Sequence, residues 1–333
     1  MRLNNNFGVG ILGMGSYLPD KVLSNQDLEK MVETSDEWIV KRTGISERRL
    51  LEKDEPAYKM GVEAAQKALE DAGLTAEDID LIICATVSAD YIYPQTACLI
   101  QAGIGAKRAA AFDINVACSG FVYGITIAQQ FISTGCYNKV LVVGCEGISR
   151  TIDWEDRNTC VLFGDGAGAA VLGKVEEGYG ILSTKLGADG ESGKCVTLPC
   201  YFLDEEDLSH RVHDNKQVIW MDGGEVFKFA VKIMAQATEE VVGKAALTLD
   251  DINMFFPHQA NTRIIEGALK RLHVKAERTY PIIQKYGNIS SASIPVGIDE
   301  AAKAGKIKKG DNLVLVGFGG GLTWASAVIK WAK

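Results

Sequence analysis

Cys118 is the residue of this chain that is best placed to act as a nucleophile. It lies in Ala117-Cys-Ser-Gly-Phe121, between an apolar run at 109–114 and a helix-like stretch at 121–133. This order is typical of a strand, a sharp turn and a helix, and it would put the thiol at a helix N-terminus, where unpaired backbone N–H groups favour the thiolate. The alternative is an inert core cysteine, because Cys is among the most buried residue types.

His258 is the candidate imidazole partner, in the second half of the chain. It follows the apolar segment Phe255-Phe-Pro257 and precedes a helix predicted over 261–272, and α/β sheets collect reactive groups at such strand ends. The alternative is a core histidine with satisfied hydrogen bonds. The remaining histidines lie in a polar segment or after a helix end: His210, His213 and His273. No further ligand neighbours the first two, so a metal site is not expected there.

The two halves of the chain repeat each other at a fixed offset. Leu74-Thr75 recurs 173 residues later as Leu247-Thr248, and Val143-Gly144 recurs at the same offset as Val316-Gly317. Several separate matches at one offset indicate an internal duplication. Each half shows helices alternating with strands, which favours parallel sheets covered by helices.

The positions at which the halves differ indicate a reaction centre. Cys118 corresponds to Ser291, whereas His258 corresponds to Ala85, so one half keeps a thiol and the other an imidazole. Asn288 corresponds to Asn115, beside Cys118, although an Asn that caps a turn before a helix is the alternative. If the halves pack about a pseudo-dyad, equivalent strand ends meet, and we expect these unlike side chains to converge.

The predicted fold class is α/β, a duplicated α-β-α-β-α body of five layers. We expect an N-terminal half at 1–175, which carries the thiol, and a C-terminal half at 176–333, which carries the imidazole and the carboxamide. The polar, aperiodic segment 187–218 predicts a surface excursion with little regular structure. The sequence predicts strands over 81–85, 110–114, 139–144, 312–317 and 323–331, and helices over 56–72, 121–133, 225–243 and 261–272.

Composition narrows the class of protein. The 333 residues, 47% of them apolar, can bury an ample core. A net charge of −8 without a sustained basic stripe argues against a nucleic-acid binder. The eight cysteines form no CxxC pair, which favours reduced thiols. Since no signal-like segment or membrane-spanning apolar run is present, we expect a cytoplasmic protein with no membrane partner.

Two glycine-rich stretches have different interpretations. Gly164-Asp-Gly-Ala-Gly168 precedes an apolar run and does not open a helix, so it supports a nucleotide-binding loop only weakly. Gly317-Phe-Gly-Gly-Gly321 follows a predicted strand. Glycines there let backbone N–H groups approach a reacting carbonyl, as an oxyanion hole requires, and a tight hairpin would use them as well.

Together these motifs resemble the β-ketoacyl-acyl-carrier-protein synthase III family, the thiolase-fold condensing enzymes that start bacterial fatty-acid synthesis. The resemblance covers essentially the whole chain and includes Ser35-Asp-Glu-Trp38, Arg42-Thr-Gly-Ile-Ser-Glu-Arg-Arg49, Pro257-His-Gln-Ala-Asn261 and Gly287-Asn288. It implies a thiolase-like form of the five-layer fold. By this resemblance, Asn288 separates the chain from elongating synthases, whose catalytic set is Cys-His-His, and from degradative thiolases, whose set is Cys-His-Cys. Plant-type polyketide synthases share Cys-His-Asn but lack these flanking motifs.

The resemblance implies a decarboxylative Claisen condensation. Cys118 would attack a short acyl-CoA, with the oxyanion held by the backbone N–H groups of Cys118 and Gly320. Malonyl-acyl-carrier protein would then lose carbon dioxide, with His258 and Asn288 donating hydrogen bonds to the enolate and Phe318 desolvating the departing carboxylate. No metal or redox cofactor is implied, and coenzyme A enters as a thioester substrate.

The same resemblance implies the contacts with substrates and partners. Trp38 and Arg157 would sandwich the CoA adenine by stacking and cation–π contact. Further CoA contacts would come from Thr34, Arg42 and Asn261. A basic patch for the acidic acyl carrier protein would consist of Lys228, Arg263, Lys270 and Arg271. The chain is expected to form a homodimer in which Tyr93 of one subunit completes the acyl pocket of its neighbour.

Departures from the family pattern leave the starter acyl group open. Gly224 stands where family members often carry an Asn that touches the pantetheine arm, Tyr93 stands where Phe is common, and the excursion 187–218 is longer than in compact members. One rival interpretation is a relative that transfers acyl groups to an amine, an alcohol or a secondary metabolite. Another is a catalytically silent partner subunit, which the retention of Cys118 disfavours.

Overall fold

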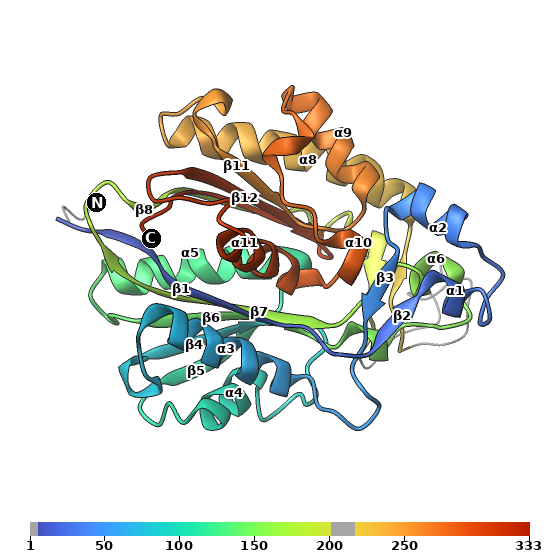
Figure 1. Ribbon diagram of the computed structural model, residues 1–333, viewed down its shortest axis with the longest axis horizontal. Coiled ribbons are helices and arrows are strands. Elements are labelled where there is room, and N and C mark those ends of the chain that lie inside the picture. The colour runs from blue at the N-terminus through green and yellow to red at the C-terminus, as the bar shows by residue number, and fades with distance from the viewer. Residues whose placement is uncertain (1–5, 201–216) are drawn as a thin grey trace.

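Two mixed β-sheets form the centre of the molecule (Figure 1). The computed structural model describes residues 6–200 and 217–333. The first sheet is five-stranded, in the order β1 (Gly8–Tyr17), β7 (Gly166–Val175), β6 (Val140–Glu146), β4 (Leu81–Ala85) and β5 (Ala110–Ile114). The second is four-stranded, in the order β11 (Met254–Pro257), β12 (Asn312–Gly319), β13 (Thr323–Lys330) and β8 (Gly180–Ala188). The pairs β4–β5, β4–β6 and β11–β12 are parallel, and the other neighbours in the two sheets are antiparallel.

Helices cover both sheets and fill the space between them. Figure 1 shows α5 (Gly120–Ser133) and α11 (Ser293–Lys303) between the sheets, α3 (Tyr58–Ala72) and α4 (Thr96–Ile104) outside the first, and α8 (Gly223–Lys244) and α9 (Thr262–Leu272) outside the second. One buried apolar cluster joins the two inner helices to both sheets and includes Ile125, Val142, Ile298, Leu315 and Ala327. These five layers confirm the predicted fold class.

Local sequence accounts for the packing of these layers. Every residue of β4 and of β6 is buried, as expected for strands covered on both faces. Gly13 and Gly15 of β1 let α3 pack directly on the sheet, because a Cβ at either position would lie 2.4 Å from a backbone oxygen of that helix. On the opposite side of the molecule, α9 begins where the Asn261 side chain accepts the backbone N–H of Arg263.

Shorter elements complete the described chain. The strands are β2 (Val22–Ser24), β3 (Glu47–Arg49), β9 (Val196–Thr197) and β10 (Trp220–Met221), and the short helices are α1 (Asn25–Leu28), α2 (Asp36–Thr43), α6 (Arg157–Cys160) and α10 (Ile283–Tyr286). The 3₁₀ turns are η1 (Ala76–Asp78), η2 (Ala117–Ser119), η3 (Ile148–Thr151), η4 (Gly193–Cys195), η5 (Leu249–Asp251), η6 (Ala276–Arg278) and η7 (Ser290–Ala292).

The internal repeat extends to the geometry of single turns. η1 and η5 lie 173 residues apart, and each begins with a threonine capping box, at Thr75 and Thr248. η2 and η7 are related by the same offset, and each begins in the left-handed region, at Ala117 with φ 47° and at Ser290 with φ 46°. The division of the chain at residue 175 remains a prediction, and β7 ends at that residue.

The described ends of the predicted excursion 187–218 have little regular structure, as expected, apart from short stretches of strand and one 3₁₀ turn. β8 continues to Ala188, and within the predicted excursion β9 pairs with β10, which lies just beyond it. Residues 201–216 lie outside the described chain. The predicted helix 225–243 starts two residues earlier, at Gly223, because the Asp222 carboxylate accepts the backbone N–H groups of Gly224 and Glu225. Among the described residues, no helix has the length and apolar character needed to cross a membrane.

Candidate active site

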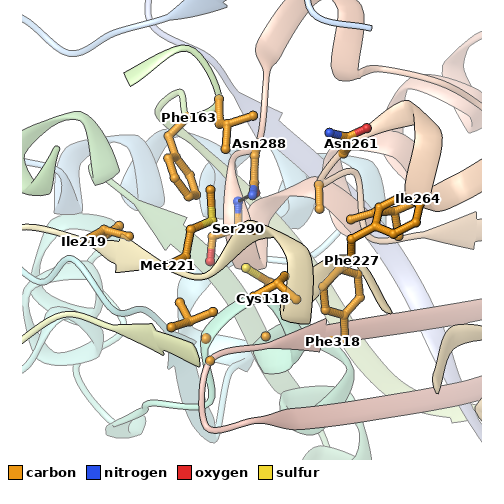
Figure 2. A pocket seen from close by; sticks show the side chains of 18 of the residues that line it. Cys118, Phe163, Ile219, Met221, Phe227, Asn261, Ile264, Asn288, Ser290 and Phe318 are labelled. Atoms are coloured by element: carbon orange, nitrogen blue, oxygen red, sulfur yellow. Dashed lines mark hydrogen bonds between the residues drawn. The ribbon is translucent and has the colours of Figure 1, made fainter. Parts of the chain in front are cut away.

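A cavity of about 1130 Å³ brings together the candidate reactive residues of both halves. Cys118 from η2, His258 from the end of β11, Asn288 before η7 and Phe318 from β12 all line it. Figure 2 shows Cys118, Asn288 and Ser290 close together at its centre, with Phe227 and Phe318 to one side. The expected convergence of strand ends is therefore found in the structure.

Cys118 is held at the start of α5 by close backbone packing. A Cβ at Gly319 would lie 2.5 Å from the backbone N of Cys118, and one at Gly317 would lie 3.1 Å from the Cys118 carbonyl oxygen. Glycine at these positions allows β12 to pack on the cysteine turn. Gly320 lines the cavity nearby, at the start of the short connection between β12 and β13. The glycine stretch thus forms a hairpin and also lies beside the thiol.

The expectation of a stabilised thiolate at Cys118 was wrong. Burial raises the pKa of the Cys118 thiol to about 12, and the nearby Glu146 carboxylate raises it further. The hydroxyl of Ser290, a polar neighbour of the sulfur, acts on the pKa in the opposite direction but is the smaller effect. The resting cysteine is therefore a neutral thiol. Sequence could not indicate this, because the desolvation arises from residues distant along the chain.

His258 is buried in a position that keeps the imidazole neutral. Burial lowers the pKa of His258 to about 3. Its Nδ1 atom lies 2.7 Å from Ser293 Oγ, and the backbone N–H of Gln259 points to the same oxygen at 3.4 Å. When the Ser293 hydroxyl donates to Nδ1, the ring proton of the neutral imidazole lies on Nε2, which is then the donor toward the cavity. The Phe318 ring packs edge-on against the imidazole, with centroids 5.5 Å apart.

Asn288 is fixed by its backbone and by its side-chain oxygen. Its N–H donates to the Leu162 carbonyl at 2.8 Å, and its carbonyl accepts the Gly164 N–H at 3.1 Å. Asn288 Oδ1 accepts the backbone N–H of Ser290 at 2.9 Å, so the turn-capping interpretation also holds. With Oδ1 used in this way, the Nδ2 group is the donor that Asn288 can offer to a ligand.

The predicted CoA contacts gather only in part around the cavity. Trp38, Arg42 and Asn261 line it, whereas Thr34 and Arg157 do not. The Arg157 guanidinium nevertheless lies 5.0 Å from the Trp38 ring centroid, and that of Arg42 lies 5.5 Å away. Asn261 links two helices, since its Nδ2 donates to the Arg42 carbonyl at 3.0 Å.

Only some of the residues predicted to bind the carrier protein line the cavity. Lys228 and Arg263 line the cavity, while Lys270 and Arg271 are exposed in the last turn of α9 and do not line it. Lys228 pairs with Glu225 at 2.7 Å on the surface of α8. The Arg263 guanidinium lies 5.5 Å from the Phe227 ring centroid, which places a cation beside an aromatic wall of the cavity.

Tyr93 and Gly224, the two departures from the family pattern, differ in position. Gly224 lines the cavity, where its N–H donates to Asp222. Tyr93 does not line it; the residue is 84% exposed and follows Tyr91 and Ile92, which are also exposed. A single chain therefore does not bring Tyr93 to the site.

Sequence analysis missed the polar residues that support the site. Glu146 at the end of β6 and Ser293 beside His258 are both buried, and neither was singled out. One signal was present, because Glu146 is a charge that directly follows the uncharged run Val140-Leu-Val-Val-Gly-Cys145, at the kind of strand end that marks His258. The described residues contain no group of three His, Cys, Asp or Glu side chains arranged to hold a metal ion.

Comparison with known proteins places this site in a family. Residues 112–190 match the model of 3-oxoacyl-[acyl-carrier-protein] synthase III, and residues 242–331 match the model of its C-terminal part. A relative from Caldanaerobacter subterraneus named beta-ketoacyl-[acyl-carrier-protein] synthase III is 57% identical, with 97% of this chain and 98% of the relative aligned.

Solved structures give the same result. The crystal structure of 3-oxoacyl-[acyl-carrier-protein] synthase III from Aquifex aeolicus superposes with a TM-score of 0.91 at 45% identity, covering 97% of this chain and 100% of that one. The priming β-ketosynthase of the R1128 polyketide biosynthetic pathway superposes with a TM-score of 0.92 at 34% identity, covering 100% and 99%. This chain therefore belongs to the 3-oxoacyl-[acyl-carrier-protein] synthase III family.

Proposed function

We propose that this protein condenses a short acyl-CoA with malonyl-acyl-carrier protein, releasing carbon dioxide and forming the β-ketoacyl-acyl-carrier protein that initiates fatty-acid synthesis. The observation that carries the proposal is the cavity in which a thiol, a neutral imidazole and a carboxamide meet. Family membership supports the reaction class.

In the first half-reaction, the Cys118 sulfur attacks the thioester carbonyl of the acyl-CoA. The negative charge on the carbonyl oxygen is stabilised by the backbone N–H groups of Cys118 and Gly320. The new S–C bond forms as the C–S bond to coenzyme A breaks, which leaves an acyl-enzyme. The close packing of Gly319 on Cys118 supports this pairing of backbone donors from the two halves.

In the second half-reaction, malonyl-acyl-carrier protein loses carbon dioxide and its enolate attacks the acyl-enzyme. Nε2–H of His258 and the Nδ2 group of Asn288 donate hydrogen bonds to the enolate oxygen. A neutral imidazole suits this role, since it stays a donor without first taking a proton. The Phe318 ring offers the departing carboxylate an apolar surface. The thioester already activates the acyl group, so the scheme requires no metal or redox cofactor.

The wider surface of the cavity binds the substrates and partners in this proposal. CoA lies across Trp38, which lines the cavity, and the neighbouring Arg157, and the basic residues on α8 and α9 meet the acidic carrier protein. Two copies of the chain form a homodimer in which each Tyr93 reaches the neighbouring site. We place the enzyme in the cytoplasm and keep the halves 1–175 and 176–333 as its structural units.

The decisive test is Cys118→Ala. Incubation of the wild type with acetyl-CoA is expected to add one acetyl group at Cys118 by mass spectrometry, and addition of malonyl-acyl-carrier protein is expected to release carbon dioxide. The variant is expected to lose both acylation and condensation. An unchanged turnover in the variant would exclude the mechanism, and transfer of the acetyl group to an amine or alcohol without carbon dioxide release would favour the rival acyltransferase. Assaying a panel of acyl-CoAs would then identify the starter.

A further inference from the structure

A buried carboxylate lies where the two halves of the chain meet. Glu146 ends β6 and its side chain is fully buried. Oε2 accepts Ser88 Oγ at 2.6 Å and the Val87 N–H at 3.1 Å, and Oε1 accepts the hydroxyls of Ser290 and Ser291, each at 2.9 Å. These donors in the described chain are all neutral. A carboxylate that is buried without a cation among the described residues is costly, and only neutral hydrogen-bond donors hold it here.

Ser290 connects this carboxylate with the reaction centre. Its backbone has a φ of 46°, in the left-handed region that residues other than Gly, Asn and Asp rarely adopt. Its hydroxyl bonds Glu146 Oε1, and its side chain lines the cavity beside Cys118 (Figure 2). Ser290 is also the side-chain hydrogen-bonding group that lowers the pKa of the Cys118 thiol. One serine thus lies beside the nucleophile and bonds the carboxylate.

The nucleophile needs a group that accepts its proton. Cys118 rests as a thiol, since burial holds its pKa near 12. His258 is a poor acceptor, because its pKa is about 3 and its Nδ1 is already bonded to Ser293. Burial raises the pKa of Glu146, which makes that carboxylate a stronger base than an exposed one.

We propose that Ser290 and Glu146 form a proton relay for Cys118. As the sulfur bonds to the acyl carbon, the thiol proton moves to Ser290 Oγ while the proton of Ser290 moves to Glu146 Oε1. The C–S bond to coenzyme A breaks, and the coenzyme A thiolate takes its proton from water. When the condensation product leaves, the relay runs in reverse and Glu146 returns the proton to the Cys118 sulfur. This inference rests on the proposed function, because it needs an acyl-enzyme at Cys118.

Among the described residues, the titratable groups coupled to Glu146 and Cys118 are acids and thiols, not cations. Glu146 and Cys118 are coupled electrostatically, and Glu146 also acts on Cys84 of β4 and on Cys145, its neighbour on β6. Asp113 of β5 and Asp90 act on Cys145 as well. His258 lines the same cavity as Cys118. Glu146 is therefore the base that the relay makes available to the thiol.

The test measures the rate of Cys118 acylation by acetyl-CoA between pH 6 and pH 9 in rapid-quench mass spectrometry. In the wild type the rate is expected to level off once Glu146 is ionised. Glu146→Gln and Ser290→Ala are each expected to lower the rate at pH 7 by about 100-fold. In both variants the rate should rise about tenfold per pH unit without a plateau, because hydroxide becomes the acceptor.

Ser291→Ala is the matched control. Ser291 donates to the same Glu146 oxygen and to the Ala85 carbonyl, and in the described part of the chain it makes no hydrogen bond to the thiol. This variant is expected to keep the plateau of the wild type. If Glu146→Gln and Ser290→Ala keep the plateau, whatever the height of that plateau, the relay is overturned. The proposed function would still hold in that case, because the wild type forms the acyl-enzyme. A wild type that forms no acyl-enzyme would overturn the function itself, and the relay with it.

Discussion

At the scale of single residues, burial determines the protonation states of the site. Desolvation raises the pKa of Cys118 to about 12 and lowers that of His258 to about 3, so a neutral thiol shares the cavity with a neutral imidazole. A thiolate–imidazolium pair is therefore not the resting state. His258 is suited to donate a hydrogen bond to a developing oxyanion, and the thiol must lose its proton elsewhere.

This assignment predicts that His258→Ala separates the two half-reactions. Carbon dioxide release from malonyl-acyl-carrier protein should fall by about 100-fold or more, because an oxyanion donor is lost. Acylation of Cys118 should fall much less, because its oxyanion is held by backbone N–H groups. Stopped assays of carbon dioxide release and of acyl-enzyme mass measure the two rates. Equal losses in both would contradict the proposed role.

Burial of His258 also predicts a pH dependence of stability. The pKa is about 3 in the folded protein and 6.5 in the unfolded chain, so the unfolded chain binds the proton first as the pH falls. The stabilisation is complete above about pH 6.5 and is lost progressively between about pH 6.5 and pH 3. At pH 5 this loss is about 2 kcal/mol.

Denaturant unfolding of His258→Gln measures this contribution. The variant should lose about 2 kcal/mol less than the wild type between pH 7 and pH 5. His273→Gln changes an exposed histidine at the end of α9 and is the matched control, which should follow the wild type. If both variants have the same pH dependence as the wild type, the neutral buried state of His258 is excluded.

At the scale of elements, the site depends on how closely β12 packs on η2. Gly319→Ala would place a Cβ 2.5 Å from the Cys118 backbone N and 2.9 Å from the Ala117 Cβ. We expect a loss of about 1 to 3 kcal/mol in the free energy of unfolding, together with slower acylation because the turn is displaced. Urea unfolding and acyl-enzyme mass spectrometry measure the two effects.

Gly320→Ala is the matched substitution for this prediction. Its Cβ would meet no atom closer than 3.6 Å, so the free energy of unfolding should change by less than about 0.5 kcal/mol. If the two alanine variants are equally stable, the close packing of Gly319 does not limit the fold.

Sequence predicted the elements better than their interactions. The buried strands and the helices around Cys118 and His258 were correct, because apolar runs and strand-end polar residues are local signals. The pairing of β9 with β10 was missed, because each strand is two residues long and has no pattern of its own. Glu146 was missed because its hydrogen-bond donors come from the connection between β4 and α4 and from η7. Only the folded chain brings these two segments together.

At the scale of the whole molecule, duplication explains how the site is divided. The repeat at 173 residues places η2 and η7 in contact across the inner layer, and these equivalent turns carry different side chains. Cys118 and its counterpart Ser291 therefore lie near each other, the first facing the cavity and the second bonded to Glu146. Comparing the sequences of the two halves could identify that these turns differ. It could not identify which side chains of the folded chain would then contact each other.

The proposed homodimer predicts which exposed segment of the molecule forms the subunit interface. Tyr91, Ile92 and Tyr93 form an exposed segment, with residue accessibilities of 54%, 63% and 84%. Contiguous apolar exposure of this kind is typical of a protein interface. Ile92→Asp should dissociate the dimer, because it would bury an unpaired charge, and should slow condensation since each site loses the Tyr93 of its neighbour. Sedimentation velocity measures the dissociation, with Ile92→Val as the matched control that keeps an apolar side chain. A wild type that sediments as a monomer and is fully active would exclude the shared pocket, whereas a dimeric Ile92→Asp variant would place the interface elsewhere on the molecule.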